Sequence, residues 1–128
     1  MLNLFSKYKI IFYSCNIVLI IFYLYPGSIA GYFLYNDLSK QPQLTNDFVI
    51  SSNHFYIFCL VSILGFFTYM EIEKIKSLII YLILLSIFLE ILHLVIPNRG
   101  FEYSDLFGNL LGVFLIFILF NIYKFLKN

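Results

Sequence analysis

Residues 90–112 read Glu90-Ile-Leu-His93-Leu-Val-Ile-Pro97-Asn-Arg99-Gly-Phe-Glu102-Tyr-Ser-Asp105-Leu-Phe-Gly108-Asn109-Leu-Leu-Gly112. Acids, a histidine, an arginine and an amide are concentrated in this segment, whereas most of the chain around it is apolar. An ionisable side chain at membrane depth costs at least roughly 2.5–3.5 kcal/mol on insertion scales. It persists only when it is paired, hydrogen-bonded or in contact with water, so each one is a candidate for function.

The composition is that of an integral membrane protein. The 128 residues are 62% hydrophobic and 12% charged, whereas a soluble domain is about 45–50% apolar and about 25% charged. At this length we expect a single domain over residues 1–128. The net charge of +1 excludes the basic surface that nucleic-acid binding requires. Cys15 and Cys59 stand apart in apolar runs, which is typical of small buried residues.

Four apolar segments have the length that a membrane-crossing helix needs, roughly 17–25 residues. They cover roughly residues 8–25, 54–70, 77–96 and 105–123. Pro26-Gly27 ends the first segment and Pro97 ends the third, because proline stops a helix. Open strands would leave backbone groups unpaired in lipid. The sequence therefore predicts an all-α membrane protein, a four-transmembrane-helix antiparallel bundle, with a polar outer loop at residues 36–53 and short connections at residues 71–76 and 98–104.

The first segment also resembles part of a signal peptide. Lys7 and Lys9 precede the apolar run, and Ser28-Ile29-Ala30 is a small-x-small pattern. The run is long for a signal peptide, however, and apolar sequence resumes at Gly31. We therefore expect this segment to be retained as a membrane anchor.

The lysines predict how the helices are oriented. Six of the eight basic residues fall on one side of the predicted bundle: Lys7, Lys9, Lys74, Lys76, Lys124 and Lys127. Only Lys40 and Arg99 fall on the other side. Because cytoplasmic loops carry the excess of lysine and arginine, both termini should be cytoplasmic.

This topology brings polar residues from three helices and a loop to the outer side. Glu90 and His93 share a helix face at a spacing of three, and Asp105 and Asn109 lie four apart on the last helix. We expect an outward-facing polar cup formed by six binding residues: His54, Glu90, His93, Arg99, Asp105 and Asn109.

Individual roles can be assigned within this cup. Arg99 can form a bidentate pair with Asp105, with Glu90 or with an anionic ligand, because its planar fork matches carboxylates and phosphates. An alternative is that Asp105 only caps the last helix, with Arg99 as its salt-bridge partner. Gly108 and Gly112 form a small-xxx-small pattern and are predicted to pack helices together.

A metal site formed by His54, Glu90, His93 and Asp105 is conceivable, because Glu-x-x-His places two ligands on one helix face, as in di-iron bundles. Only one such pair occurs, and the chain has no thiolate cluster. We therefore expect no metal and no cofactor. A serine or cysteine nucleophile with a base is not evident either.

On these residues the sequence resembles the VanZ-like family of small bacterial membrane proteins. That family has a glutamate, a glutamine three residues later, a proline-arginine loop, an aspartate, an asparagine four residues on and a glycine three beyond. The corresponding residues here are Glu90, His93, Pro97, Arg99, Asp105, Asn109 and Gly112. Two departures are that His93 replaces the glutamine, and that Ile50-Ser51-Ser52-Asn53 precedes His54 where the family often has an Asp-Lys pair.

The resemblance implies a function in the cell envelope, since the founding member is linked to low-level resistance to the glycopeptide teicoplanin. Our first hypothesis is that the cup binds an envelope component, such as a lipid, a wall precursor or a glycopeptide. The alternative is a small intramembrane enzyme acting on a lipid or lipid-linked substrate, with Glu90 as general acid or base and Asp105 as an orienting carboxylate. Membrane lipids are expected partners, and the apolar helix faces would permit oligomers. A transporter or pore is disfavoured, because no charged stripe crosses the full membrane depth.

Overall fold

The computed structural model describes residues 4–70 and 72–128, and within them it contains helices and no strands. The elements, in chain order, are α1 (Leu4–Leu24), α2 (Ile29–Tyr35), α3 (Ser52–Thr68), α4 (Ile72–Leu92) and α5 (Tyr103–Lys127). The prediction of an all-α protein is confirmed.

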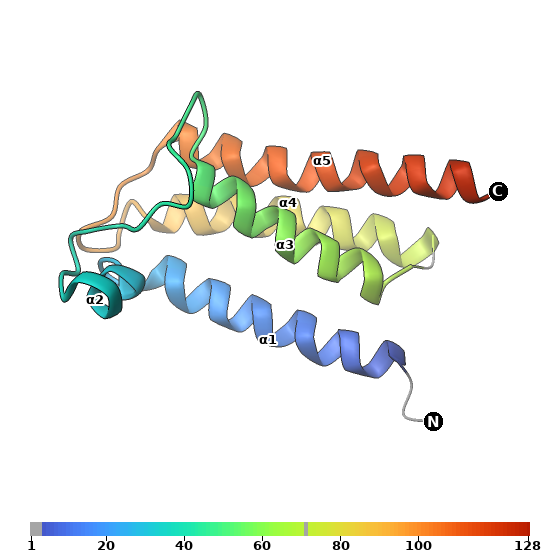
Figure 1. Ribbon diagram of the computed structural model, residues 1–128, viewed down its shortest axis with the longest axis horizontal. Helices are drawn as coiled ribbons and strands as arrows, with labels where there is room; N and C mark the ends of the chain where they lie inside the picture. The colour runs from blue at the N-terminus through green and yellow to red at the C-terminus, as the bar shows by residue number, and fades with distance from the viewer. Residues whose placement is uncertain (1–3, 71) are drawn as a thin grey trace.

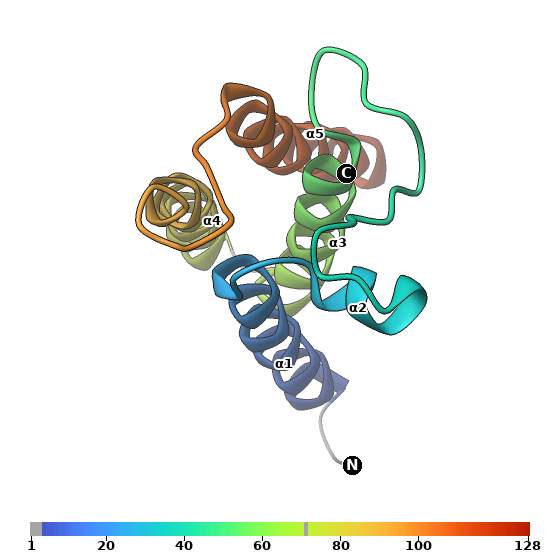
Figure 2. The same cartoon turned by 90° about the vertical axis from the view of Figure 1, so that its left-hand side faces the viewer.

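Successive long helices run in opposite directions (Figure 1). The start of α1 and the end of α5 lie at one end of the molecule, and α2 and the loop at residues 36–51 lie at the other. The end-on view shows the four long helices grouped side by side (Figure 2). Helix α3 contacts each of the other three long helices and packs most extensively against α5. The C-terminal ends of α1 and α4 and the N-terminal ends of α3 and α5 therefore meet at the end opposite the termini.

Two helices are long and apolar enough to cross a membrane, namely Glu73–Leu92 within α4 and Tyr103–Lys127. A third crossing is added if α1 and α2, which are bent by 81° at the predicted Pro26-Gly27 break, count as one span. Helix α3 is apolar but only 17 residues long, or roughly 26 Å at 1.5 Å per residue, against a hydrocarbon core of about 30 Å. The structure thus supports two to three membrane-crossing helices where the sequence predicts four.

The end of α4 differs from the prediction in a way that matters for the site. We expected this helix to continue to Ile96, but it ends at Leu92. The amides of His93, Leu94 and Val95 each donate to the carbonyl three residues before. This tightening into turns takes the chain out of the helix ahead of Pro97, because residues before proline avoid the helical conformation.

The other boundaries shift by a few residues. Helix α4 begins at Ile72, so most of the predicted connection at residues 71–76 is helical; Glu71 lies outside the described residues. Helix α2 was not predicted from the sequence. Its N-cap is Ser28, whose hydroxyl accepts from the Gly31 amide, and Asn36 ends it with a φ of 52°. Because α3 begins at Ser52, the predicted outer loop is shortened to residues 36–51.

The interior combines a small apolar core with a helix exterior that is also apolar. Phe58, Val61, Leu82 and Val113 are fully buried between the helices. Outward-facing residues of α5 such as Phe114 and Ile118 are exposed. A helix that is hydrophobic all round, with most of its surface outside the protein core, is typical of a membrane environment.

Candidate functional site

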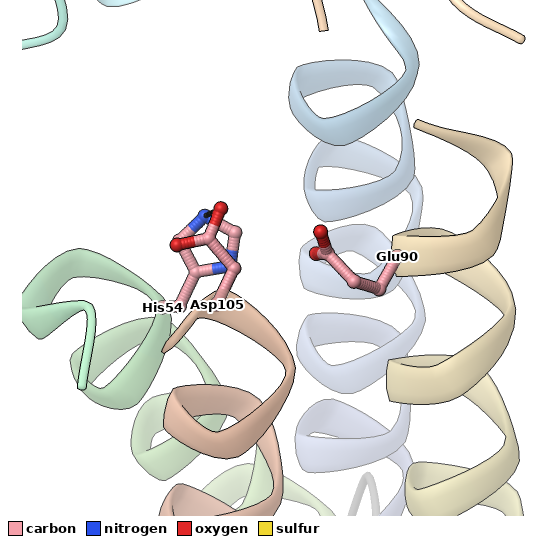
Figure 3. A group of neighbouring side chains, drawn as sticks. All are labelled: His54, Glu90 and Asp105. Atoms are coloured by element: carbon pink, nitrogen blue, oxygen red, sulfur yellow. Dashed lines mark ion pairs between the residues drawn. The ribbon is translucent and has the colours of Figure 1, made fainter. Parts of the chain in front are cut away.

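Six polar side chains meet where the ends of the four long helices converge, and we call them the polar cluster: Tyr23, His54, Glu90, His93, Asp105 and Asn109. Figure 3 shows three of them, His54 from α3, Glu90 from α4 and Asp105 from α5, extending into the same space. Four of the six residues, Tyr23, Glu90, His93 and Asn109, are buried. A buried polar group is costly unless it is bonded, so the partners of each group matter.

Glu90 and His93 form the deepest pair of the cluster. His93 Nδ1 lies 3.4 Å from Glu90 Oε1, and the two side chains are 2% and 0% exposed. His93 Nε2 donates to the Tyr23 carbonyl at 2.9 Å, which ties the turn after α4 to the end of α1. The Glu102 amide donates to Glu90 Oε1 at 3.0 Å. Glu90 Oε1 is therefore in contact with the turn that follows α4 and with the residue that precedes α5.

His54 and Asp105 form a second pair nearer the end of the molecule. His54 Nε2 lies 3.4 Å from Asp105 Oδ2, and these side chains are 15% and 19% exposed. The pair joins the start of α3 to the start of α5, which are also joined by the Ser51 amide donating to the Ser104 carbonyl at 3.1 Å. The cluster is thus open at its His54–Asp105 side and closed at its Glu90–His93 side.

Tyr23 and Asn109 connect the two pairs. The Tyr23 hydroxyl donates to Asn109 Oδ1 at 2.8 Å, and it also lies 3.0 Å from His54 Nδ1. His54 Nδ1 is 3.1 Å from Asn109 Oδ1. The Tyr23 ring stacks on His93, with centroids 5.7 Å apart. Sequence reasoning missed Tyr23, because it is one of 11 tyrosines and a tyrosine at a helix end resembles an ordinary interfacial aromatic.

Arg99 lies outside the polar cluster, and its predicted pairing with Asp105 or Glu90 is wrong. Its Nε donates to the Tyr25 carbonyl at 3.2 Å, and its Nη2 donates to the carbonyls of Phe22 and Gly27 at 3.0 and 2.7 Å. The last carbonyls of a helix have no helical partner and carry its negative end, so they attract a cation. Partial burial lowers the pKa of the Arg99 guanidinium from its ordinary value, and the group remains cationic at neutral pH.

The alternative in which Asp105 caps the last helix is also wrong. Glu102 is the N-cap of α5, and Asp105 lies in the first turn of the helix. The Asp105 carboxylate faces His54 instead of a free amide of its own helix. The early start of α5, at Tyr103, explains the difference, because it makes Asp105 the third residue of the helix instead of its cap.

Gly108 and Gly112 lie in the contact between α5 and α3. A Cβ on Gly108 would lie 2.8 Å from the Ser51 carbonyl oxygen, and a Cβ on Gly112 would lie 2.7 Å from the Phe55 carbonyl oxygen. These distances are shorter than carbon-oxygen contacts allow. The two glycines let α5 approach α3 closely enough for Asn109 and Asp105 to reach His54.

Two buried atoms of the cluster have no hydrogen-bond partner within the described residues, Glu90 Oε2 and Asn109 Nδ2. A carboxylate oxygen accepts hydrogen bonds or binds cations, and an amide nitrogen donates. His54, Glu90 and Asp105 each offer one potential metal-ligand atom, and these atoms lie within 4.8 Å of one another. The cluster can therefore accept protons, bind hydroxyl or ammonium groups, or bind a cation.

No protein-family model matches the chain, and neither the curated proteins nor the solved structures contain a match. Only the geometry of the polar cluster and the residue pattern of positions 90–112 therefore point to a function.

Proposed function

We propose that the chain is a VanZ-like protein of the bacterial cytoplasmic membrane that binds a polar group of a cell-envelope molecule through the polar cluster. In this proposal α1, α3, α4 and α5 all cross the membrane as an antiparallel bundle with both termini in the cytoplasm. Lys9, Lys74, Lys76, Lys124 and Lys127 lie in helix regions toward the end that carries the termini. The positive-inside rule supports that end as cytoplasmic, and the polar cluster then faces outward.

The observation that carries the proposal is the fully buried carboxylate of Glu90, with one oxygen unpartnered, near the partly buried carboxylate of Asp105. Apolar residues would pack the helix ends at lower cost, since charged groups at membrane depth are expensive. Carboxylates accept hydrogen bonds from hydroxyl and ammonium groups. Lipid head groups, wall precursors and glycopeptides all carry such groups, and the more open His54–Asp105 side gives them access.

Susceptibility of a teicoplanin-sensitive Gram-positive host tests the proposal. The host would express the wild type, Asp105→Ala or, as a matched control, Asp37→Ala, which removes a partly exposed acid of the outer loop. Membrane levels would be equalised by immunoblot. We expect protection by the wild type and by Asp37→Ala, and loss of protection by Asp105→Ala. Equal susceptibility of all strains, the empty-vector strain included, would contradict the teicoplanin phenotype.

A second candidate function is an intramembrane enzyme that acts on a lipid-linked envelope substrate, with Glu90 as general acid or base. The free Glu90 Oε2 favours it, because a general base must offer an unoccupied oxygen to the proton that it removes. Glu90→Gln keeps the shape of the side chain and most of its hydrogen bonds but cannot transfer a proton. Binding without catalysis predicts that Glu90→Gln retains much of the phenotype, whereas catalysis predicts that it loses all of it.

A further inference from the structure

Three groups that commonly bind metal ions converge from three helices. His54, Glu90 and Asp105 each present a ligand atom, all within 4.8 Å of one another, and Figure 3 shows the three side chains directed toward a shared space. His54 Nε2 and Asp105 Oδ2 are 3.4 Å apart. Two ligands of a tetrahedral ion that each lie 2.0–2.2 Å from it are also roughly 3.4 Å apart.

The Glu90 carboxylate supplies the second observation. Its Oε1 accepts from the Glu102 amide and faces His93. Its Oε2 is buried without a hydrogen-bond partner, although the residue is 0% exposed. A buried, unpartnered carboxylate oxygen is costly, and a cation removes that cost.

The hydrogen bonds of His54 orient its other ring nitrogen as a ligand. Because the Tyr23 hydroxyl gives its proton to Asn109 Oδ1, His54 Nδ1 is the donor in its contacts with both oxygens. In the neutral ring, Nε2 then carries the lone pair, and it is directed at Asp105. A lone pair facing a carboxylate is repulsive unless a proton or a metal ion lies between them. Metal-binding histidines are held in this way, with the second ring nitrogen donating to a neighbouring oxygen.

We propose that His54 Nε2, Glu90 Oε2 and Asp105 Oδ2 bind a divalent transition-metal ion, with Zn²⁺ as the representative probe. Imidazole with carboxylate is a ligand set suited to such ions. Two carboxylates and a neutral imidazole carry two negative charges, which a divalent cation balances in a low-dielectric site. The 4.8 Å separation exceeds that of a filled tetrahedral site by on the order of 1 Å, and side-chain rotation of Glu90 can close it.

This inference replaces the expectation, drawn from the sequence, that the chain binds no metal. The sequence offered one Glu-x-x-His pair and no thiolates, whereas the fold adds ligands from two further helices. His93 is not a ligand here, because its Nε2 donates to the Tyr23 carbonyl and its Nδ1 faces Glu90 Oε1. The proposed ion would occupy the same Glu90 and Asp105 oxygens that the proposed function assigns to an envelope molecule. Metal binding is still tested separately, because zinc titration of the purified chain is read without an envelope molecule.

The competing explanation is that protons, rather than a metal ion, neutralise the cluster. His54 and His93 each face a carboxylate at 3.4 Å, so two imidazolium ions would also balance Glu90 and Asp105. The Arg99 guanidinium does not provide this balance, because it donates its hydrogen bonds to carbonyls at the end of α1. The two explanations differ in one measurable respect, which is whether the purified protein binds a metal ion stoichiometrically.

Zinc titration of the purified full chain tests the proposal. The protein would carry no polyhistidine tag, be treated with EDTA in detergent micelles, and compete with a chromophoric chelator for added Zn²⁺. We expect one ion per chain. Loss of a group that hydrogen-bonds to a ligand and orients it costs about 10–100-fold in metal affinity. Removal of a direct ligand in His54→Gln, Glu90→Gln or Asp105→Asn should therefore weaken binding by at least about 100-fold.

Two further variants separate ligands from neighbours. Glu102→Gln removes a nearby exposed carboxylate but keeps the backbone amide that donates to Glu90, so its affinity should equal that of the wild type. Tyr23→Phe removes the hydroxyl that accepts from His54 Nδ1 and should weaken binding by about 10-fold. Helix content by circular dichroism and elution as a single species would establish that each variant is folded.

Substitution with Co²⁺ gives a readout on the wild type alone, because its visible absorption bands report the number and geometry of ligands. Intense bands typical of a four-coordinate ion would support the proposal even if a ligand variant failed to fold. A wild type that binds no Zn²⁺, or a Glu90→Gln variant that binds it as tightly as the wild type, would overturn the proposal. The second result would mean that the ion is bound elsewhere.

Discussion

The two ends of the molecule are built from different interactions. At the end that carries the termini, Phe66 of α3 stacks on Phe120 of α5 with ring centroids 4.8 Å apart, and Phe12 of α1 meets Tyr69 edge-on at 5.8 Å. At the opposite end the same four helices meet through Tyr23, His54, Glu90, His93, Asp105 and Asn109.

The difference separates packing from chemistry. Aromatic and aliphatic contacts are sufficient to hold the helices together at the terminal end, since packing drives helix association in lipid. The polar end achieves the same association with groups that are costly to bury. Selection for stability alone does not account for those groups, which is why we propose a binding or catalytic role for them.

The largest effect on stability should come from breaking the deepest pair. His93→Leu removes the partner of a fully buried carboxylate and should lower the free energy of unfolding by about 3–5 kcal/mol, the usual result of leaving a buried charge unpaired. Glu90→Leu combined with His93→Leu should recover much of that loss. Reversible unfolding in mixed detergent micelles measures both. A double variant as unstable as His93→Leu would show that the unpaired Glu90 charge is not the cause of the loss.

The helix contact beneath the polar cluster should be the next most sensitive position. Gly112→Ala places a Cβ 2.7 Å from the Phe55 carbonyl oxygen and 3.0 Å from the Cys59 amide nitrogen. We expect a loss of about 1–3 kcal/mol, which is typical of overpacking. Gly100→Ala is the matched control, because a Cβ there meets nothing within 4 Å, and its midpoint of thermal unfolding should be that of the wild type. Equal midpoints for the two variants would contradict a close α3–α5 contact.

Arg99→Lys keeps the positive charge but loses the planar fork that donates to three carbonyls. We expect a loss of about 1–2 kcal/mol, since a lysine at this position can satisfy fewer of these bonds. Zinc affinity in the same variant should be unchanged, because Arg99 holds α1 and does not touch the proposed ligands. A large loss of zinc affinity with little change in stability would show that Arg99 contributes to the proposed metal site.

The smallest effect should come from the apolar end. Phe66→Leu removes one side of the stack with Phe120 and should cost about 0.5–1.5 kcal/mol, the range for an aromatic pair. Both zinc affinity and teicoplanin susceptibility should remain at wild-type values. A functional loss as large as that of Asp105→Ala would mean that the two ends are not separable.

The sequence predicted the parts of this fold that depend on hydrophobicity. The four long helices follow from apolar runs and from Pro26-Gly27 and Pro97. Bringing His54, Glu90, His93 and Asp105 to one end required only the order of the helices and their alternating directions. The boundaries were less predictable, since no local pattern distinguishes a helix that ends at Leu92 from one that continues to Ile96.

Side-chain partners could not be predicted, because they depend on distances of a few ångströms between helices. Arg99 is equally suited to a carboxylate and to helix carbonyls, and the nearness of the α1 end decides the outcome. Tyr23 was overlooked for the same reason, since only the packed structure brings its hydroxyl to His54 and Asn109. The metal ligands likewise come from three helices, which a spacing rule within one helix does not detect.

In the proposed orientation the polar cluster opens to the outside of the membrane, and cysteine labelling in intact cells tests this orientation most directly. Cys15 and Cys59 would be replaced by alanine, and a single cysteine introduced by Glu102→Cys, beside the cluster, or by Asn128→Cys, at the opposite end. A membrane-impermeant maleimide should label the protein carrying Glu102→Cys in intact cells and label the one carrying Asn128→Cys only after lysis. The reverse pattern would place the cluster in the cytoplasm and contradict a role in recognising envelope molecules.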